Sequence, residues 1–317
     1  MDEFELIRRF FSAQPVQRED VLLGIGDDAA LLHVPAAQEL VVSTDTLVAG
    51  MHFPVNLSAE AVGHRALAVN LSDLAAMGAA PAWALLALTL PEVDEKWLEG
   101  FSRGFFQLAR RFNVALVGGN LARGALNITL SVHGFVPPGE ALTRSGARAG
   151  DHVFVTGCLG DAAAGLERLR AGVDAADADS GVRRFCFPEP RIIAGLALRG
   201  IASAAIDVSD GFAADLGHIL QASGVGARIA VASLPLSPAL LRHVPREEAE
   251  RLALSGGDDY ELCFTVPPER MQRFESRKGM LDCPVTRLGE IIPEKTLRCM
   301  RTDATEWPLN AAGYKHF

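Results

Sequence analysis

Residues 58–78 read SAEAVGHRALAVNLSDLAAMG, and this stretch predicts the first long helix of the chain. Ser58 is a favourable N-cap residue and Glu60 adds an acidic side chain to the first turn, so we expect a helix over Ala59–Met77. At helical spacing, one stripe combines apolar side chains with a carboxylate. The stripe consists of Val62, Ala66, Val69, Asp73 and Ala76. Because a carboxylate in apolar surroundings is costly without a positive partner, Asp73 indicates a functional role.

Acidic and hydroxyl residues gather in four further places along the chain. These are GIGDDAA (24–30), STD (43–45), AIDVSDG (205–211) and SGGDDYE (255–261). Aspartates in a glycine-led turn and a helix cap at Ser43-Thr44-Asp45 are structural alternatives for the first two. Grouped hard oxygen ligands suit Mg²⁺, which binds through one or two carboxylates together with substrate phosphates. The whole set therefore predicts metal-assisted phosphate chemistry.

Composition limits the class of protein. The chain has 317 residues, of which 49% are apolar, so it can form two domains or one large α/β domain. A net charge of -9 argues against a nucleic-acid or anionic-membrane partner. Five dispersed cysteines favour reduced thiols in a cytoplasmic protein, and the acidic start lacks the features of a signal peptide. The most apolar window, 66–90, is interrupted by polar residues and Pro81, so we expect no membrane span.

Helical and strand-like segments alternate along the chain, which predicts an α/β fold with mixed α+β layers. We expect strands at 40–43, 84–90, 114–117, 127–135, 151–156, 204–208, 228–231, 261–266 and 285–290. We expect helices within the first 20 residues and at 59–77, 97–112, 161–171, 212–223, 247–254 and about 269–277. Pro137-Pro138-Gly139 favours a boundary between two domains, 1–138 and 139–317.

The usual nucleotide-binding motifs are weak or missing. GIGDDA (24–29) fits the dinucleotide pattern, but its two aspartates would repel a pyrophosphate. No Gly-Lys-Ser/Thr occurs, so there is no Walker A motif. Any nucleotide is therefore expected to be held by metal ions, arginines and backbone amides.

Seven strings of the sequence together resemble one enzyme family. They are GIGDDAALL, STDTLVAGMHF, NLSDLAAMGA, LTRSGARAGD, VTGCLGDAAAGL, AIDVSDGFAADLGHIL and SGGDDYELCFTV, in this order. The chain resembles the thiamine-monophosphate kinases, of the superfamily typified by aminoimidazole ribonucleotide synthetase, from about Phe4 to Phe317. The resemblance implies an N-terminal domain that binds metal and ATP and pairs in a homodimer, followed by a C-terminal α/β domain. It also implies transfer of a phosphate group from ATP to thiamine monophosphate, which gives thiamine diphosphate and ADP.

The resemblance assigns roles residue by residue. The implied Mg²⁺ ligands are Asp28, Ser43, Thr44, Asp45, Asp73, Asn120, Asp207 and Asp210. The implied nucleotide contacts are Gly119, Asn120, Arg144 and Ser209. The implied contacts to thiamine phosphate are His52, Asp258 and Tyr314. Asp45, Asp73 and Asp210 are expected to be essential, and no residue is expected to act as a general base.

Two departures from the family pattern concern these positions. The family usually has Asp where this chain has Asn120, which offers a carbonyl oxygen but no charge. The acid that contacts the substrate is commonly Glu, whereas Asp258 is shorter. Both changes affect affinity and leave the chemistry possible.

The chemistry needs no strong base. A phosphate monoester has a second pKa of about 6, so the acceptor is already anionic at neutral pH. The difficulty is to bring two polyanions together, which several Mg²⁺ ions and Arg144 would ease in an in-line transfer. The cationic thiazolium ring favours an acid and an aromatic face, such as Asp258 and Tyr314.

Other functions remain open from the sequence. Within the superfamily, a selenophosphate synthetase would show a reactive Cys and Lys near the N-terminus, but the first ones here are Cys158 and Lys96. A hydrogenase-maturation relative would carry a C-terminal cysteine, and this chain ends in Phe317. Aminoimidazole ribonucleotide synthetase shares the acidic clusters and stays an alternative. A non-catalytic protein that binds metal or nucleotide is the alternative from another class, favoured by Asn120.

Overall fold

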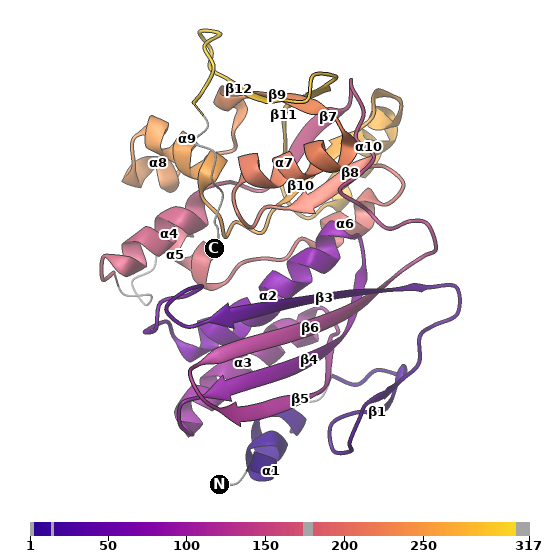
Figure 1. Cartoon of the computed structure of the whole chain (residues 1–317), viewed down its shortest axis with the longest axis vertical. Helices are drawn as coiled ribbons and strands as arrows, with labels where there is room; N and C mark the ends of the chain where they lie inside the picture. The colour runs from indigo at the N-terminus through magenta and orange to yellow at the C-terminus, as the bar shows by residue number, and fades with distance from the viewer. Residues whose placement is uncertain (1–2, 14–15, 174–179, 309–317) are drawn as a thin grey trace. The chain divides into compact units, whose positions relative to one another are not determined.

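The computed structural model describes residues 3–13, 16–173 and 180–308 (Figure 1). The chain forms two compact units. Unit 1 comprises Met1–Leu74 with Ala79–Gly139, and unit 2 comprises Ala75–Gly78 with Glu140–Phe317. Each unit combines a β-sheet with helices, which confirms the predicted α/β class with two domains.

Unit 1 is built around a four-stranded sheet in the order β3-β6-β4-β5. Its elements are α1 (Glu3–Leu6), the π-helix η1 (Ile7–Ser12), β1 (Val21–Leu23), β2 (Leu31–Leu32), β3 (Glu39–Val48), α2 (Ala59–Ala76), β4 (Ala80–Leu90), α3 (Glu95–Arg111), β5 (Ala115–Arg123) and β6 (Asn127–Val136). Strand β6 pairs antiparallel with β3 and β4, and β4 pairs in parallel with β5. Helices α2 and α3 lie against one face of this sheet (Figure 1).

Alternation along the strands decides which side chains meet the helices. Leu47, Leu86 and Leu130 are buried, whereas Leu40 and Val42 on the opposite side are 44% and 54% exposed. One face of the sheet therefore forms the core of unit 1, and much of the other face is open in the isolated chain.

Helices α2 and α3 approach each other through glycines. A Cβ atom on Gly63 would lie 2.0 Å from the carbonyl oxygen of Phe101, and one on Gly104 would lie 2.0 Å from that of Glu60. Helix α3 begins at Asp94, whose carboxylate accepts the backbone N–H groups of Lys96 and Trp97. The absence of side chains at the crossing lets the backbones of α2 and α3 come into contact.

Unit 2 contains a six-stranded sheet in the order β12-β9-β11-β7-β10-β8, in which only the β12–β9 pair is parallel. Its elements are β7 (His152–Thr156), α4 (Asp161–Arg170), α5 (Ser180–Cys186), α6 (Ile192–Leu198), β8 (Ala204–Asp207), α7 (Phe212–Ser223), β9 (Gly226–Ala230), η3 (Val231–Ser233), α8 (Leu240–His243), α9 (Arg246–Ser255), β10 (Leu262–Val266), η4 (Pro268–Arg270), α10 (Met271–Arg277), η5 (Lys278–Met280), β11 (Val285–Ile292) and β12 (Leu297–Met300). Its core packs Phe212, Leu216 and Ile219 of α7 against Val153 and Ile206 of the sheet.

Several expected boundaries were wrong. Ser43-Thr44-Asp45 lies in the middle of β3 and caps no helix, and Asn120 lies inside β5 and does not follow the strand. Helix α2 is buried around most of its circumference, while Asp73 itself is partly exposed, so the apolar stripe does not define one buried face. Short elements such as α5, α6 and β12 were missed because a few residues carry too little periodicity.

No helix in the described part of the chain is both long enough and apolar enough to cross a membrane.

We predict that Gly104→Ala lowers the free energy of unfolding by about 1–3 kcal/mol or more, because the added methyl group would overlap the Glu60 carbonyl. Gly217→Ala in α7 is the matched control, since no heavy atom lies within 4 Å of the added Cβ. The control should be neutral or stabilising by up to about 1 kcal/mol through helix propensity. Denaturant unfolding of both variants checks this. Equal effects of the two substitutions would contradict the close helix crossing.

Candidate functional site

Ser43, Asp45 and Asp73 come together on the helix side of unit 1. Ser43 and Asp45 lie two residues apart on β3 and so share a face, and Asp73 reaches them from α2. The Ser43 hydroxyl donates to Asp73 Oδ2 at 2.5 Å. The backbone N–H of Asp45 donates to Asn70 Oδ1 at 3.1 Å, and the Asn70 amide in turn donates to the Ala66 carbonyl. The buried helix thus supplies both a carboxylate and a polar support to the strand.

The two carboxylates of this group repel each other. Burial raises the pKa of Asp45 to about 6, and the negative charge of Asp73 adds to the rise. A cation placed between like charges would relieve both causes. The pair therefore has the chemistry of a cation site.

Thr44 does not join this group through its side chain. Strand alternation turns it to the opposite face of the sheet, where its hydroxyl lies 2.7 Å from Ser131 Oγ. Thr46 and Thr129 form a second hydroxyl pair on that face, at 2.9 Å. The Thr44 hydroxyl therefore lies on the side of the sheet where Ser131 lines the pocket described next.

A pocket of about 680 Å³ lies on this opposite face of unit 1. Its walls comprise the loop 25–30, apolar residues of the N-terminal helical segment, and parts of the three strands β4, β5 and β6. Asp28, Gly119 and Asn120 all line it. The structure therefore brings three of the predicted site residues to one pocket, with acidic residues and backbone at one part of its wall and apolar side chains at another.

Gly119 is required by a close approach of two strands. Its φ is 152°, and a Cβ atom there would lie 1.8 Å from the carbonyl oxygen of Leu86 on β4. No other residue fits without moving β5 away from β4. The main chain beside Asn120 is consequently open to the pocket.

His52 and Arg144 lie outside these groups. His52 follows β3 in a turn, and its Nδ1 accepts the backbone N–H of Val48 at 3.0 Å. Arg144 is exposed in the segment before β7 in unit 2, where its carbonyl accepts the Ser223 hydroxyl at 3.2 Å. Tyr314 lies outside the described residues.

In unit 2, Asp207, Ser209 and Asp210 lie on one short loop. Asp207 ends β8 and is 5% exposed, and Ser209 and Asp210 precede α7. Asp215, in the first turn of α7, accepts the backbone N–H groups of residues 209, 210 and 211 on a single oxygen. Burial raises the pKa of Asp215 to about 7, whereas these three hydrogen bonds oppose the rise. Sequence reasoning missed Asp215, although a carboxylate between Ala214 and Leu216 in the first turn of a predicted helix was a visible signal.

A second loop runs beside the first and carries Asp258. The backbone N–H of Asp258 donates to the Ser209 carbonyl at 2.8 Å, and that of Tyr260 donates to the Val208 carbonyl at 2.8 Å. Asp258 and Tyr260 both have positive φ, at 69° and 50°. Positive φ is costly for residues with a Cβ atom, so strong surrounding contacts must hold this loop in place.

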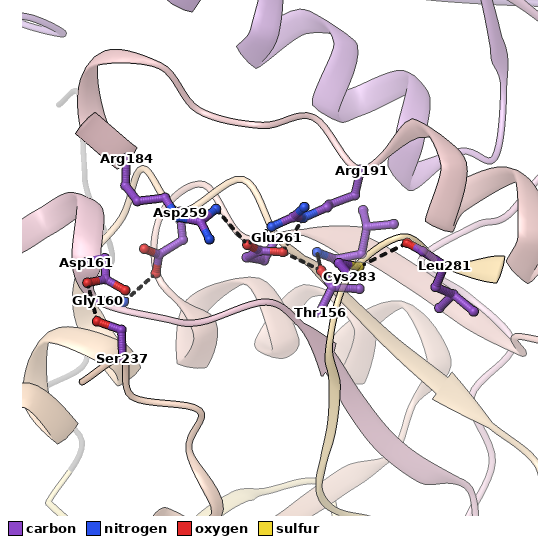
Figure 2. A network of polar contacts seen from close by, with 11 residues as sticks. Thr156, Gly160, Asp161, Arg184, Arg191, Ser237, Asp259, Glu261, Leu281 and Cys283 are labelled. Atoms are coloured by element: carbon purple, nitrogen blue, oxygen red, sulfur yellow. Dashed lines mark hydrogen bonds and ion pairs between the residues drawn. The ribbon is translucent and has the colours of Figure 1, made fainter. Parts of the chain in front are cut away.

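Those contacts centre on Glu261, which is 1% exposed (Figure 2). Arg191 binds its carboxylate with two nitrogens at 2.6 and 2.5 Å, and the Thr156 hydroxyl donates to it at 2.6 Å. Arg184 lies 3.6 Å away. Burial lowers the pKa of Arg191, but the hydrogen bonds and the charge of Glu261 outweigh this effect and raise the pKa above its usual value.

Asp259 points to the other side of the same loop, where its Oδ2 accepts the backbone N–H of Gly160 at 2.9 Å (Figure 2). Gly160 immediately precedes α4, so Asp259 meets the positive end of that helix. Burial raises the pKa of Asp259 well above its usual value, against the effect of the backbone donors of Gly160 and Ala162. Sequence reasoning treated the SGGDDYE string as one acidic cluster, but only Asp258 belongs to its partly exposed side.

The predicted residues are thus divided between the two units. In the described ranges 3–13, 16–173 and 180–308, no group of three or more His, Cys, Asp or Glu side chains is arranged to hold a metal ion alone. Oxygen atoms from Ser43, the backbone or a ligand would have to complete a coordination shell around the carboxylate pair.

Comparison with known proteins identifies the family. The profile of the AIR synthase related protein, N-terminal domain, matches residues 26–136, and that of the C-terminal domain matches 148–301. The thiamine-monophosphate kinase of Escherichia coli is 52% identical over 99% of this chain and 98% of its own length. That of Bacillus subtilis is 36% identical, with full coverage of both chains.

Solved structures agree with this. The thiamine-monophosphate kinase of Stenotrophomonas maltophilia is 47% identical, covers 94% of this chain and 96% of its own, and has a TM-score of 0.87. AaThiL complexed with AMPPCP and TMP is 33% identical, with 99% and 97% coverage and a TM-score of 0.78. The hydrogenase maturation protein HypE of E. coli has a TM-score of 0.80 at 20% identity, and so shares the fold. The chain belongs to the thiamine-monophosphate kinase family.

Proposed function

We propose that this chain transfers the γ-phosphoryl group of ATP directly to the phosphate of thiamine monophosphate with the help of Mg²⁺. A phosphate oxygen of the acceptor would form the new bond to the γ-phosphorus as its bond to the β-phosphate oxygen breaks and ADP leaves. Membership of the family and the AMPPCP and TMP bound to AaThiL support the two substrates. The observation that carries the metal-assisted part is the group of Ser43, Asp45 and Asp73, which brings two carboxylates and a hydroxyl together between β3 and α2. Burial, and to a lesser extent the charge of Asp73, raises the pKa of Asp45 to about 6.

The pocket of unit 1 is suited to the nucleotide. Its volume of about 680 Å³ is in the range of small-molecule sites, and its apolar residues Phe4, Ile7 and Leu116 would suit a base. Gly119 and Asn120 would face the phosphates at the polar part of the wall. Without a lysine of the Walker type, charge on the phosphates must be balanced mainly by cations.

The donor atoms present fit Mg²⁺, which prefers carboxylate and phosphate oxygens. In unit 1 the helix side of the sheet would supply Asp45, Asp73 and the Ser43 hydroxyl. The pocket side would supply Asp28, the Thr44 hydroxyl and the Asn120 amide oxygen. In unit 2 the ligands would be Asp207 and Asp210. When bound, the ions would neutralise the triphosphate and the acceptor phosphate and so lower the barrier to in-line transfer.

The remaining predicted residues would hold the substrates. Arg144 is exposed and would balance phosphate charge, and Ser209 would contact the nucleotide from its loop. His52 and Asp258 would contact thiamine monophosphate, with Asp258 opposite the cationic thiazolium ring. Tyr314 is proposed as the aromatic partner of that ring.

We also propose a cytoplasmic homodimer. The open face of the unit 1 sheet exposes Leu40, Val42 and Leu85 next to the two hydroxyl pairs, and a second copy of the same face would cover them. Such two-fold pairing is the commonest form of oligomer. The nucleotide pocket lies on this face, so its surroundings would be completed in the dimer.

The decisive experiment measures ADP release and thiamine diphosphate formation from ATP, with and without thiamine monophosphate and with Mg²⁺ or a chelator. We expect both products only when acceptor and Mg²⁺ are present. Turnover of ATP that does not depend on thiamine monophosphate would exclude the proposed acceptor.

Asp45→Asn should lower kcat by about a hundredfold or more, because a ligand to a charge-neutralising ion is worth several kcal/mol in the transition state. Glu39→Gln is the matched control, since it removes a carboxylate from the same strand at an exposed position. The control should keep normal turnover. Near-normal activity of Asp45→Asn would exclude the proposed metal role of this group.

Asp258→Asn should raise the KM for thiamine monophosphate more than that for ATP, because it removes an acidic partner of the thiazolium cation. The rise should be a few-fold to about thirtyfold, as for other charge contacts of about 1–2 kcal/mol. Initial-rate kinetics with each substrate varied in turn measure the two constants. Equal changes in both would show that Asp258 has been assigned to the wrong substrate.

Val42→Asp should dissociate the dimer, because it would bury a carboxylate from each copy between the paired sheet faces. Sedimentation at micromolar concentration compares the variant with the wild type. Thr302→Asp, on the surface of unit 2, adds the same charge elsewhere and should leave the oligomeric state unchanged. A wild-type monomer, or a dimer that persists in Val42→Asp, would remove this interface.

A further inference from the structure

Asp215 is a buried carboxylate for which the proposed reaction has no direct use. It is 2% exposed and lies in the first turn of α7, a helix of 12 residues. Its Oδ2 accepts the backbone N–H of Ser209 at 3.0 Å, that of Asp210 at 3.0 Å and that of Gly211 at 3.1 Å. Three consecutive main-chain donors therefore converge on one oxygen.

Such a convergence of amides at the start of a helix is the usual binding site of a phosphate group. In this protein the position is filled by the protein's own carboxylate. Asp259 does the same at α4, a helix of 10 residues, where it accepts the N–H of Gly160. The amides of residues 209–211, which precede α7, and the amide of Gly160, which precedes α4, are thus already engaged by carboxylates of the protein.

The carbonyl side of the same loop is also engaged. The carbonyl of Ser209 accepts the N–H of Asp258, and that of Val208 accepts the N–H of Tyr260. Gly211 has a φ of 115°, and a Cβ atom there would lie 2.9 Å from the main chain of Ser255. The N–H groups of residues 209–211 and the carbonyls of Val208 and Ser209 are therefore all engaged within the protein. A ligand would meet this loop mainly through its side chains.

We propose that Asp215 is a positioning residue. By accepting the N–H groups of residues 209–211, it fixes the loop that carries Asp207 and Asp210 in a conformation suited to cation binding. The part played by Asp207 and Asp210 rests on the proposed function, whereas the hold of Asp215 on the loop rests on geometry alone. The consequence is specific: the amides of residues 209–211 are held by Asp215, so this loop meets the polyphosphate through cations and side chains and not through these amides.

Asp215→Asn tests this with little change of shape, because an amide oxygen is a weaker acceptor of backbone hydrogen bonds than a carboxylate. We expect the amides of residues 209–211 to exchange with deuterium about tenfold faster than in the wild type. We expect a rise of about tenfold in the Mg²⁺ concentration at half-maximal rate and a fall in kcat. The KM for thiamine monophosphate should change less than threefold. The increase in Tm on addition of Mg²⁺ should shrink, which gives a readout independent of activity.

Leu216→Ala is the matched control. It removes a fully buried side chain from the same turn of α7 and should lower the Tm, but it leaves the carboxylate and its three donors in place. A merely structural role for Asp215 would make both variants alike in Mg²⁺ dependence and in exchange at 209–211. That outcome would overturn the proposal.

If Asp215→Asn does not fold, hydrogen exchange of the wild-type protein still tests the proposal. The amides of residues 209–211 should be strongly protected from exchange in the wild type, and exchange at unprotected rates would overturn the proposal. Absence of thiamine diphosphate formation by the wild type would instead refute the proposed function, without affecting the exchange result.

Discussion

The buried ion pair between Arg191 and Glu261 is the interaction on which the candidate site of unit 2 depends. Glu261 receives two nitrogens of Arg191 and the hydroxyl of Thr156, while its carbonyl accepts the N–H of Val208 at 2.7 Å (Figure 2). One residue therefore joins the end of β7, the start of β10, the segment before α6 and the loop after β8. Removing one partner of such a pair typically costs about 3–5 kcal/mol, because the other charge is left buried and alone. The Arg191–Glu261 pair fixes the residue that follows Tyr260, and this anchoring helps to keep Asp258 and Tyr260 at positive φ.

The aspartates discussed above fall into two groups that differ in the partners of their carboxylates. Asp215 and Asp259 are buried and accept backbone N–H groups at the starts of α7 and α4, and these donors oppose the rise in pKa that burial causes. Asp45 and Asp73 have another carboxylate as a neighbour, and a bound cation would relieve their mutual repulsion while both stay ionised. This difference separates aspartates that shape the loops from aspartates suited to ligands, and the amino-acid type alone does not reveal it.

Unit 1 shows how one sheet can serve two purposes. Its helix side buries the leucines of three strands and holds Ser43, Asp45 and Asp73, whereas its open side carries the hydroxyl pairs and the pocket beside Gly119. The glycines at the α2–α3 crossing bring the helices close enough to seal the first side. The same alternation places Thr44 on the open face beside Ser131, although its two neighbours in sequence face the helices.

The sequence by itself determined the alternation of helices and strands, the two α/β domains, the long helices α2 and α7, and the family. Each of these depends on local periodicity or on strings of adjacent residues. Only the tertiary structure decided that Ser43-Thr44-Asp45 lies within a strand, that Asp28 and Asn120 line one pocket, and that Asp258 lies beside Ser209. It also separated Asp259 from Asp258, since neighbours in a loop of positive φ can point to opposite sides. The physical reason is that burial and many hydrogen-bond partners, which set the charge and orientation of a carboxylate, come from distant segments. Asp73 meets Ser43 across 30 residues, Asp259 meets Gly160 across 99, and Glu261 meets Thr156 across 105.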